Sequence, residues 1–329
     1  MEKPHDIGFK LSNMLTYAQN FEDVMLERLF KDQADGFYVD IGAWHPSLYS
    51  VTKHFYDKGW HGINVEPIRG QFELFEADRP RDVNLNLAVS DAAGTILFFE
   101  CADDTSLSTV NAEQAAALRQ AGHTLVEYNV EATTLGEIAA RFCPPVIDFL
   151  KVDVEGAEAN VLHGVDRSSF RPRVLVIEAT KPATPIKDWD DIEDIANWQE
   201  WEPLLLEKGY LFAYFDGLSR FYVREEDCVI MSRLTLPPGV FDRIQPSDHE
   251  GLVKQLEIVE ADRAARLTVI EQLSQQLKEL EADRVARLAV IEQLSQQLEQ
   301  LEAEKIKYGR VIQICTFIHE RIWPRDQGP

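Results

Sequence analysis

The chain has 329 residues, 45% of them hydrophobic, and a formal net charge of −23 at pH 7. This length suits one large domain plus a further segment, and the acidic balance argues against nucleic-acid binding, which needs clustered lysine and arginine. The four cysteines form no Cys-x-x-Cys pair, which argues against a zinc ribbon or a redox motif. We find no secretion signal and no segment long and apolar enough to span a bilayer, so we expect a cytoplasmic protein.

Taken in chain order, residues 1–235 alternate strand-like and helix-like segments, which predicts one α/β domain. The expected helices lie at 21–30, 47–59, after Pro67, and at 133–142, 157–164 and 201–210. The expected strands lie at 36–42, 61–67, 83–90, 95–100, 146–156 and 173–180, with a hairpin at 210–225. This alternation predicts a mostly parallel sheet with right-handed crossovers, closed by an antiparallel hairpin. Such a layout is that of a Rossmann-like class I methyltransferase.

Residues 236–250 are rich in proline and charge and predict a linker, and residues 251–304 predict a coiled coil. Its centre is a 21-residue sequence that occurs twice in succession, at 260–280 and 281–301. Apolar heptads without glycine or proline favour a left-handed coiled coil over a single solvated helix. The segments "RLTVIE" and "RLAVIE" favour a trimeric homo-oligomer over a dimer, in a shifted register. With Ile270 at position a, the apolar a and d positions are Ile270, Leu273, Leu277, Leu280, Ile291, Leu294, Leu298 and Leu301, and arginines 263, 266, 284 and 287 fill the others.

Residues 305–329 form a basic amphipathic tail on an otherwise acidic chain. This composition is typical of a helix that lies on anionic lipid, which would place the protein peripherally on the cytoplasmic face of the membrane. A cap for the coiled coil and a docking site for a biosynthetic partner protein are the alternatives. The residues concerned are apolar Val311, Ile312, Ile314, Phe317, Ile318, Ile322 and Trp323, and basic Lys305, Lys307, Arg310, Arg321 and Arg325.

The crossover at residues 37–67 resembles the start of a nucleotide-binding domain, but it lacks the glycine pattern that cradles a pyrophosphate. Trp44 and Pro46 would crowd a phosphate at this turn. An acid at the end of the second strand is placed to accept hydrogen bonds from both hydroxyls of a ribose. A ligand with a ribose, a positive centre and no phosphate fits, and S-adenosylmethionine is such a ligand. The candidate cofactor residues here are Asp40, Gly42, Ala43 and Glu66.

These residues belong to a longer pattern that resembles the FkbM family of S-adenosylmethionine-dependent methyltransferases over roughly residues 15–225. The matching segments are "AQNFEDVMLERLF", "FYVDIGAWHPSLYSVTKHFYDKGWHGINVEP", "LNLAVSDAAGTILFF", "IDFLKVDVEGAEANVLHG" and "RVLVIEAT". The resemblance implies methyl transfer to a hydroxyl, often on a sugar or polyketide. It also implies that Asp40, Gly42 and Glu66 bind the cofactor, with Ser90 and Asp91 near its adenine. The coiled coil and the basic tail lie outside the family pattern.

Carboxylates at the ends of two central strands are candidates for the chemistry of methyl transfer. Asp153 and Glu155 follow one strand and Glu178 ends the next. One of them could remove the proton from an acceptor hydroxyl. Alternatively, the three could hold Mg²⁺ that acidifies the hydroxyl. We favour a direct base and no metal, because no Asn-Asp pair or other clear metal motif accompanies them.

Several further residues can be interpreted in either structural or functional terms. Gln19 could contact the cofactor, while helix capping explains its neighbours Asn20 and Asp23 equally well. His45 could act as a base, but a histidine at the pocket rim without a chemical role is the preferred reading. The tryptophans at 189, 198 and 201 could form a platform for a sugar or could pack in the core.

The function that these patterns favour is that of an O-methyltransferase for a sugar hydroxyl in a surface polysaccharide or related glycan, multimerised by the coiled coil. One alternative is a non-catalytic methyltransferase-like scaffold whose coiled coil assembles partners. An NAD-dependent oxidoreductase is a weaker alternative, because the phosphate-binding glycines and a Tyr-x-x-x-Lys pair are missing.

Overall fold

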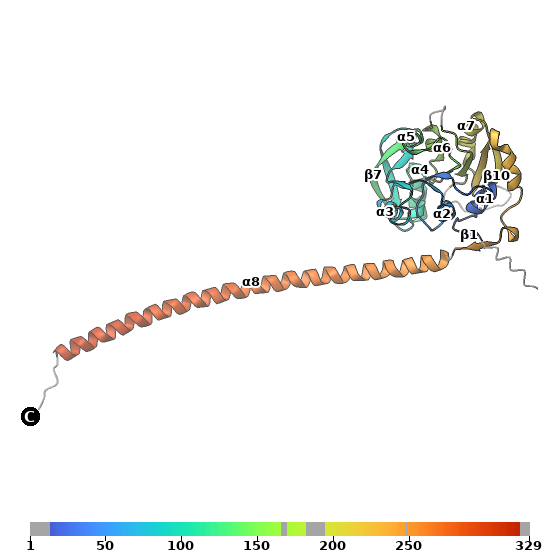
Figure 1. The fold of residues 1–329 in the computed structure, drawn as a ribbon. Coiled ribbons are helices and arrows are strands. Elements are labelled where there is room, and N and C mark those ends of the chain that lie inside the picture. Colours follow the sequence, from blue (N-terminus) through green and yellow to red (C-terminus); the bar gives the residue numbers. More distant parts are fainter. Residues whose placement is uncertain (1–13, 166–169, 182–194, 248, 323–329) are drawn as a thin grey trace, which may run out of the picture. The chain divides into compact units, whose positions relative to one another are not determined.

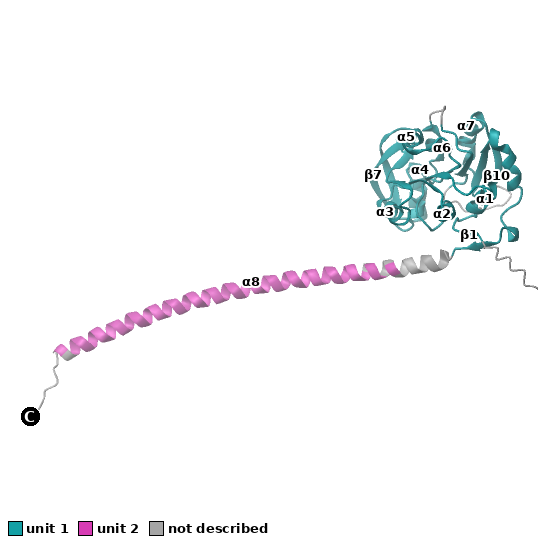
Figure 2. Cartoon of the chain, viewed as in Figure 1, with its two compact units in different colours: residues 1–249 teal, residues 250–329 magenta. Residues whose placement is uncertain are grey.

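The computed structural model describes residues 14–165, 170–181, 195–247 and 249–322. The chain divides into two compact units, residues 1–249 and residues 250–329 (Figure 2). The first unit holds the α/β domain and the second consists of one long helix, and each is described by itself.

In the described residues of the first unit, seven strands form the main sheet in the order β10-β11-β9-β8-β2-β3-β4. Figure 1 shows the strands and helices of this unit as a ribbon, with β10 labelled. The strands pair in parallel except β11, which is antiparallel to both of its neighbours. This arrangement confirms the predicted mostly parallel sheet with a closing hairpin. The strands are β2 (Phe37–Ile41), β3 (His61–Val65), β4 (Val83–Leu85), β8 (Phe149–Val152), β9 (Val174–Glu178), β10 (Tyr210–Phe215) and β11 (Ser219–Arg224).

Helices cover both faces of this sheet, because alternate side chains of each central strand are buried on opposite sides. Val39 and Ile41 of β2 pack in a core with α5, α6 and α7, whereas Tyr38 packs in a second core with α1, α2 and η4. The helices are α1 (Glu22–Leu29), α2 (Lys53–Asp57), α5 (Leu135–Phe142), α6 (Glu158–His163), α7 (Glu202–Glu207) and the 3₁₀ segment η4 (Glu225–Leu234).

The predicted strand at 83–90 is two strands that belong to different sheets. After β4, the side-chain amide of Asn86 donates to the carbonyls of Glu66 and Pro67, at 2.9 Å each, and the chain turns away from the main sheet. The next strand, β5, joins a second sheet of order β5-β7-β6. Elements of this region are α3 (Arg69–Asp78), β5 (Ala88–Ser90), β6 (Gly94–Cys101), η1 (Thr105–Leu107), α4 (Ala112–Ala121) and β7 (Leu125–Thr134).

Residues 236–247 pack on the first unit, where the sequence suggested a linker over 236–250. Strand β12 (Ile244–Pro246) pairs in parallel with β1 (Met14–Thr16), preceded by the 3₁₀ turn η5 (Val240–Asp242). The guanidinium of Arg28 donates to both carboxylate oxygens of Asp242, at 2.7 Å each, and to backbone carbonyls at residues 236 and 237. Although it is rich in proline and charge, this stretch is therefore held against β1 and Arg28 and is not a free linker.

The second unit is the helix α8 (His249–Ile322). The apolar a and d side chains of its two repeats, described above, are 57–68% exposed within a single chain. In the described part of the chain, no helix is long and apolar enough to cross a membrane. Of the basic tail, residues 323–329 lie outside the described residues.

Candidate active site

A cavity of about 800 Å³ opens at the carboxyl ends of four neighbouring strands of the main sheet. Ile41, Val65, Asp153 and Glu178 mark those ends at β2, β3, β8 and β9. Parallel sheets place their ligands at this edge, so the predicted site residues at strand ends meet here. Of the predicted candidates, the cavity is lined by Gln19, Gly42, Ala43, Glu66, Asp153, Glu155 and Glu178.

Gly42 lies where the turns after β2 and β8 approach most closely. Its φ of +74° is in the left-handed region, and a Cβ atom there would lie 1.7 Å from the carbonyl oxygen of Asp153. Both conditions demand glycine. The position therefore has a structural reason beside the predicted cofactor contact.

Glu66 follows β3 and has both carboxylate oxygens bonded to backbone. Oε2 accepts from the Trp44 amide at 2.9 Å and Oε1 from the Ile68 amide at 2.7 Å. Burial raises the pKa of this carboxyl to about 8, although the two amide bonds favour its charged form. A carboxylate has about four acceptor sites, so two remain for hydroxyl donors in the cavity.

Trp44 connects two walls of the cavity, a role that the sequence did not suggest. Its φ is +50°, and its indole N–H donates to the Thr105 hydroxyl at 3.0 Å. Its ring stacks on Tyr49, which also lines the cavity and has a φ of +52°. Left-handed backbone at non-glycine residues costs of order 1–3 kcal/mol and persists where surrounding contacts enforce it.

The loop at residues 103–111 forms a wall that sequence reasoning missed. Asp104 through Val110 line the cavity, and the Thr109 hydroxyl donates to the Glu155 carbonyl at 2.8 Å. Asn111 donates to the Gly156 carbonyl at 2.8 Å, so this loop also supports the turn after β8. The run "DDTSLSTVN" between a strand and a helix was the available signal, since such residues bond to nearby backbone in loops.

Asp40 does not line the cavity, although it was predicted to bind the cofactor. Because Val39 and Ile41 face the α5–α7 core, Asp40 points to the opposite face, where it accepts from the Thr52 hydroxyl at 3.0 Å. Its register partner on β8, Lys151, lies 3.6 Å from its Oδ1. Asp40 is therefore connected to the cavity through its ion pair with Lys151.

Lys151 lines the cavity, and its buried side chain lies among oxygen atoms. Its ammonium lies 3.2 Å from Asp153 Oδ2 and donates to the Gly42 carbonyl at 3.1 Å. Burial alone would lower the pKa of Lys151, but the nearby charges of Asp153 and Asp40 raise it overall. Lys151 therefore forms ion pairs with two neighbouring acids.

Ser90 and Asp91 also lie outside the cavity lining, at the end of β5, which belongs to the second sheet and not to the main sheet. Ser90 is buried and its hydroxyl donates to Asp91 at 3.2 Å, while Asp91 is exposed. The residues before them, Leu87 to Val89, line the cavity instead, together with Phe98. The residues of this turn that face the cavity are therefore apolar, and the predicted pair Ser90 and Asp91 is not among them.

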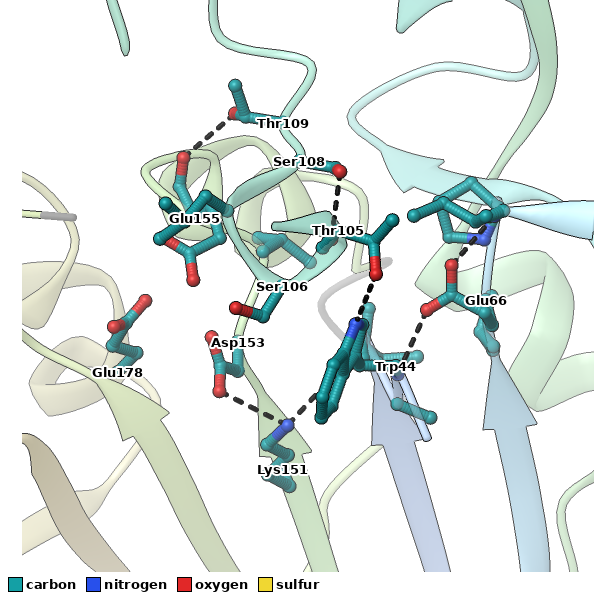
Figure 3. Close-up of a pocket in the computed structure, with 18 of the residues that line it drawn as sticks. Trp44, Glu66, Thr105, Ser106, Ser108, Thr109, Lys151, Asp153, Glu155 and Glu178 are labelled. Atoms are coloured by element: carbon teal, nitrogen blue, oxygen red, sulfur yellow. Dashed lines mark hydrogen bonds and ion pairs between the residues drawn. The ribbon is translucent and has the colours of Figure 1, made fainter. Parts of the chain in front are cut away.

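The three predicted catalytic carboxylates come together at the far side of the cavity (Figure 3). Asp153, Glu155 and Glu178 each offer an oxygen within 4.8 Å of the others. The Oε2 atoms of Glu155 and Glu178 are buried without a hydrogen-bond partner among the described residues. Burial, and then the charge of Asp153, raises the pKa of both glutamates well above its usual value.

The turn that carries Glu155 is strained and is held by Glu158. Glu155 has a φ of +54°, next to Gly156 at +90°. Glu158 Oε1 accepts from the amides of Val154 and Gly156, at 3.2 and 3.1 Å, and its Oε2 accepts from Asn197 at 3.1 Å. Glu158, in the first turn of α6, therefore holds this turn and is not part of the unpartnered cluster.

At the entrance to α1, Gln19 lines the cavity together with Glu22, which the sequence did not single out. Glu22 is buried, and its Oε2 accepts from the Asn20 amide at 2.9 Å. Burial, and then the charge of Asp216, raises the pKa of Glu22 to about 8. Asp23 accepts from Thr16 and from the Tyr17 amide, so it holds the segment before the helix.

His45 and two of the tryptophans have structural roles. His45 Nδ1 accepts from the amides of Ser47 and Leu48 at 3.0 Å each, and burial lowers its pKa to about 4. Trp201 is buried in the core. Trp198 packs on Phe215, and Trp189 lies outside the described residues.

The strand order, the closing antiparallel hairpin and the cavity at the strand ends define a Rossmann-like methyltransferase. Residues 40–212 match the family described as the Methyltransferase FkbM domain, and the chain belongs to this family. Among solved structures, a precorrin-6y C5,15-methyltransferase from Geobacter metallireducens is 14% identical, with a TM-score of 0.30 over 66% of this chain and 94% of that chain. No curated protein sequence matches the chain.

Proposed function

We propose that this methyltransferase transfers a methyl group from S-adenosylmethionine to a hydroxyl of a sugar in a surface polysaccharide or related glycan. The observation that carries the proposal is the two-sided cavity. One side offers Glu66 and an apolar wall, and the other offers three carboxylates that a hydroxyl can reach. Family membership supports the cofactor class, and the acidic side supports oxygen as the acceptor atom.

The residues on the first side fit S-adenosylmethionine. Glu66 has acceptor sites free for the two ribose hydroxyls, and Val89 and Phe98 offer apolar surface to an adenine ring. The crowding of the turn by Trp44 suits a ligand without phosphate. The cofactor supplies a methyl group bonded to a positively charged sulfur, which the acidic lining favours.

The residues on the second side act on the acceptor. The reaction requires the acceptor oxygen in line with the methyl carbon and sulfur, and it requires removal of the hydroxyl proton. Positioning contributes up to about 7–11 kcal/mol in ideal cases, and a placed base about 10²- to 10⁴-fold. One of the carboxylates Asp153, Glu155 and Glu178 can accept that proton, or the three together can hold a cation that promotes its loss.

Calorimetric titration of the full chain with S-adenosylmethionine, S-adenosylhomocysteine and NAD tests the cofactor. We expect the first two to bind and NAD not to bind. Incubation with methyl-labelled cofactor and a panel of sugars that carry free or blocked hydroxyls then tests the acceptor. Binding without transfer to any hydroxyl would overturn the acceptor class, and no binding of either adenosyl ligand would favour the non-catalytic scaffold.

We also propose that α8 assembles the protein into a homo-oligomer, with three chains preferred. Its apolar a and d positions are left exposed in one chain, and a partner helix would bury them. Sedimentation equilibrium of the full chain should give a trimer mass, and Ile270→Asn with Ile291→Asn should give monomers that still bind S-adenosylhomocysteine. Substitution of Thr268, on another face of the helix, is the matched control. A monomeric wild-type chain would refute the proposal.

A further inference from the structure

The cluster of Asp153, Glu155 and Glu178 gathers its oxygens from two strand ends that are distant in sequence. Two members follow β8 and the third ends β9, which pairs in parallel with β8. Figure 3 shows the three side chains around a common space in the cavity. Three carboxylate oxygens within 4.8 Å of one another form the donor set of a hard divalent cation.

The second observation is that each glutamate of the cluster has one buried oxygen without a hydrogen-bond partner among the described residues. Glu178 is 7% exposed, and its Oε2 has no hydrogen-bond partner among the described residues. The same holds for Glu155 Oε2. A buried carboxylate without donors is costly unless a proton or a cation compensates it. The nearby Glu158 shows that this fold can satisfy a buried acid where it needs to, since backbone and Asn197 bond to both of its oxygens.

The ammonium of Lys151 does not supply the missing compensation. It lies against Asp153, Asp40 and the Gly42 carbonyl, beneath the cluster. It thus orients one oxygen of Asp153, and the other acids of the cluster face the cavity beyond it. Side chains that bind metals are commonly oriented in this way by a neighbouring charged or polar group.

We propose that Asp153, Glu155 and Glu178 bind a divalent cation, Mg²⁺ or Mn²⁺, with the remaining positions left for water and the acceptor hydroxyl. Octahedral Mg²⁺ holds its ligands at about 2.0–2.1 Å, so neighbouring ligand oxygens lie about 3 Å apart and opposite ones about 4.2 Å. The three carboxylate oxygens, which lie within 4.8 Å of one another, would draw closer together around the bound cation. The sequence named these three residues as possible Mg²⁺ ligands but favoured a direct base, because no Asn-Asp pair or other clear metal motif accompanies them.

The role of the cation rests on the proposed function, whereas its binding does not. A hydroxyl bound to the cation loses its proton more readily, because the cation stabilises the negative oxygen. The O–H bond breaks and the proton passes to water in the cavity. The oxygen then bonds to the methyl carbon as the carbon–sulfur bond breaks, and the electron pair stays on sulfur as a neutral thioether.

Titration of the metal-stripped full chain with Mn²⁺, followed by the paramagnetic resonance signal of free Mn²⁺, tests the site without using activity. We expect one Mn²⁺ per chain, competed by Mg²⁺, and affinity lower by about 10- to 100-fold or more in Glu178→Gln. The matched control is Asp103→Asn, which alters the other group of potential ligands among the described residues, Cys101, Asp103 and His123. This variant should bind Mn²⁺ as the wild type does.

Calorimetry with S-adenosylhomocysteine on the same samples reports whether each variant is folded and separates the two hypotheses. Cofactor binding without Mn²⁺ binding would overturn the cation site and leave the proposed function standing. Mn²⁺ binding that survives Glu178→Gln in folded protein would also overturn it. Mn²⁺ binding lost in Glu178→Gln, in a chain that binds no adenosyl ligand, would support the site and count against the proposed function.

Discussion

The carboxylates on the two sides of the cavity differ in how many of their oxygens accept hydrogen bonds. On the β3 side, Glu66 has a backbone donor on each oxygen and still has acceptor sites to spare. On the β8–β9 side, Glu155 and Glu178 have buried oxygens without donors. The first state suits the hydroxyls of a ligand, which can donate to the remaining acceptor sites of Glu66. The second suits a cation brought from outside, so the two sides differ in the ligand that we propose for each.

The largest effect is expected from a substitution at Gly42, where the turns after β2 and β8 are in close contact. Gly42→Ala would place a Cβ atom 1.7 Å from the Asp153 carbonyl oxygen, at a φ that also disfavours alanine. We expect the free energy of unfolding to fall by roughly 3 kcal/mol or more, with loss of cofactor binding. Chemical denaturation of both proteins measures the change.

The control for Gly42→Ala is Gly59→Ala. Gly59 has a φ of +104° but no atom within 4 Å of a Cβ, so this variant carries the backbone strain without the collision. It should lose only about 1 kcal/mol. Equal losses in the two variants would show that the close approach is unimportant.

On the chemical side, Glu155→Gly should separate stability from activity. Glycine relieves the left-handed backbone at residue 155, so the free energy of unfolding should rise by up to about 1 kcal/mol. Methyl transfer should fall by about 10²- to 10⁴-fold, because a carboxylate of the cluster is lost. Glu155→Gln keeps the strain and should lose activity without gaining stability. An active Glu155→Gly protein would remove this residue from the chemistry.

On the cofactor side, Glu66→Ala should weaken S-adenosylhomocysteine binding by roughly a hundredfold. Each hydrogen bond to a charged group contributes about 1.5–3 kcal/mol, and each tenfold in affinity is about 1.4 kcal/mol. Mn²⁺ binding on the other side should be unchanged. Calorimetry of Glu66→Ala beside Glu66→Gln, which retains one oxygen for the backbone, checks this. Unchanged affinity in Glu66→Ala would place the ribose elsewhere.

The smallest effect concerns Glu22, a cavity acid at the entrance to α1. Burial raises its folded pKa to about 8 from a usual value of 4.5, so the folded protein binds a proton that the unfolded chain has released between these values. Its contribution to stability is therefore complete below pH 4.5 and is lost as pH rises toward 8.

Glu22→Gln keeps an uncharged group at every pH, so its Tm should match the wild type at acidic pH and exceed it increasingly toward pH 8. Thermal melts between pH 4.5 and 8.5 test this, with Glu76→Gln on the exposed face of α3 as control. A Tm difference that does not change with pH would contradict the assignment.

The sequence allowed the edge of the sheet to be located, because an acid that ends an apolar strand must leave the core there. That rule placed Glu66, Asp153 and Glu178 on the cavity. It failed for Asp40, since one residue along a strand reverses the face to which a side chain points. It also failed for Ser90 and Asp91, because the side chain of Asn86 ends one strand and the next joins another sheet.

Other parts of the site depend on contacts between segments that are distant in sequence. The 103–111 loop reaches the cavity only after β6 and β7 have formed their own sheet, so its polar run looked like an ordinary turn. The left-handed backbone of Glu155 lies in a turn that is held by hydrogen bonds to Glu158, and nothing in the local sequence predicts it. The heptads of α8, by contrast, predict a helix without any tertiary contact, and the helix is observed.

The pairing of β1 with β12 also has a mechanical consequence. Tension that arrives along α8 would enter the first unit at β12, beside the Arg28–Asp242 ion pair. The three residues of β12 and that ion pair would bear the load first, and the seven-stranded sheet would not. Separation of β12 from β1 under such tension would leave the strands that surround the cavity in place.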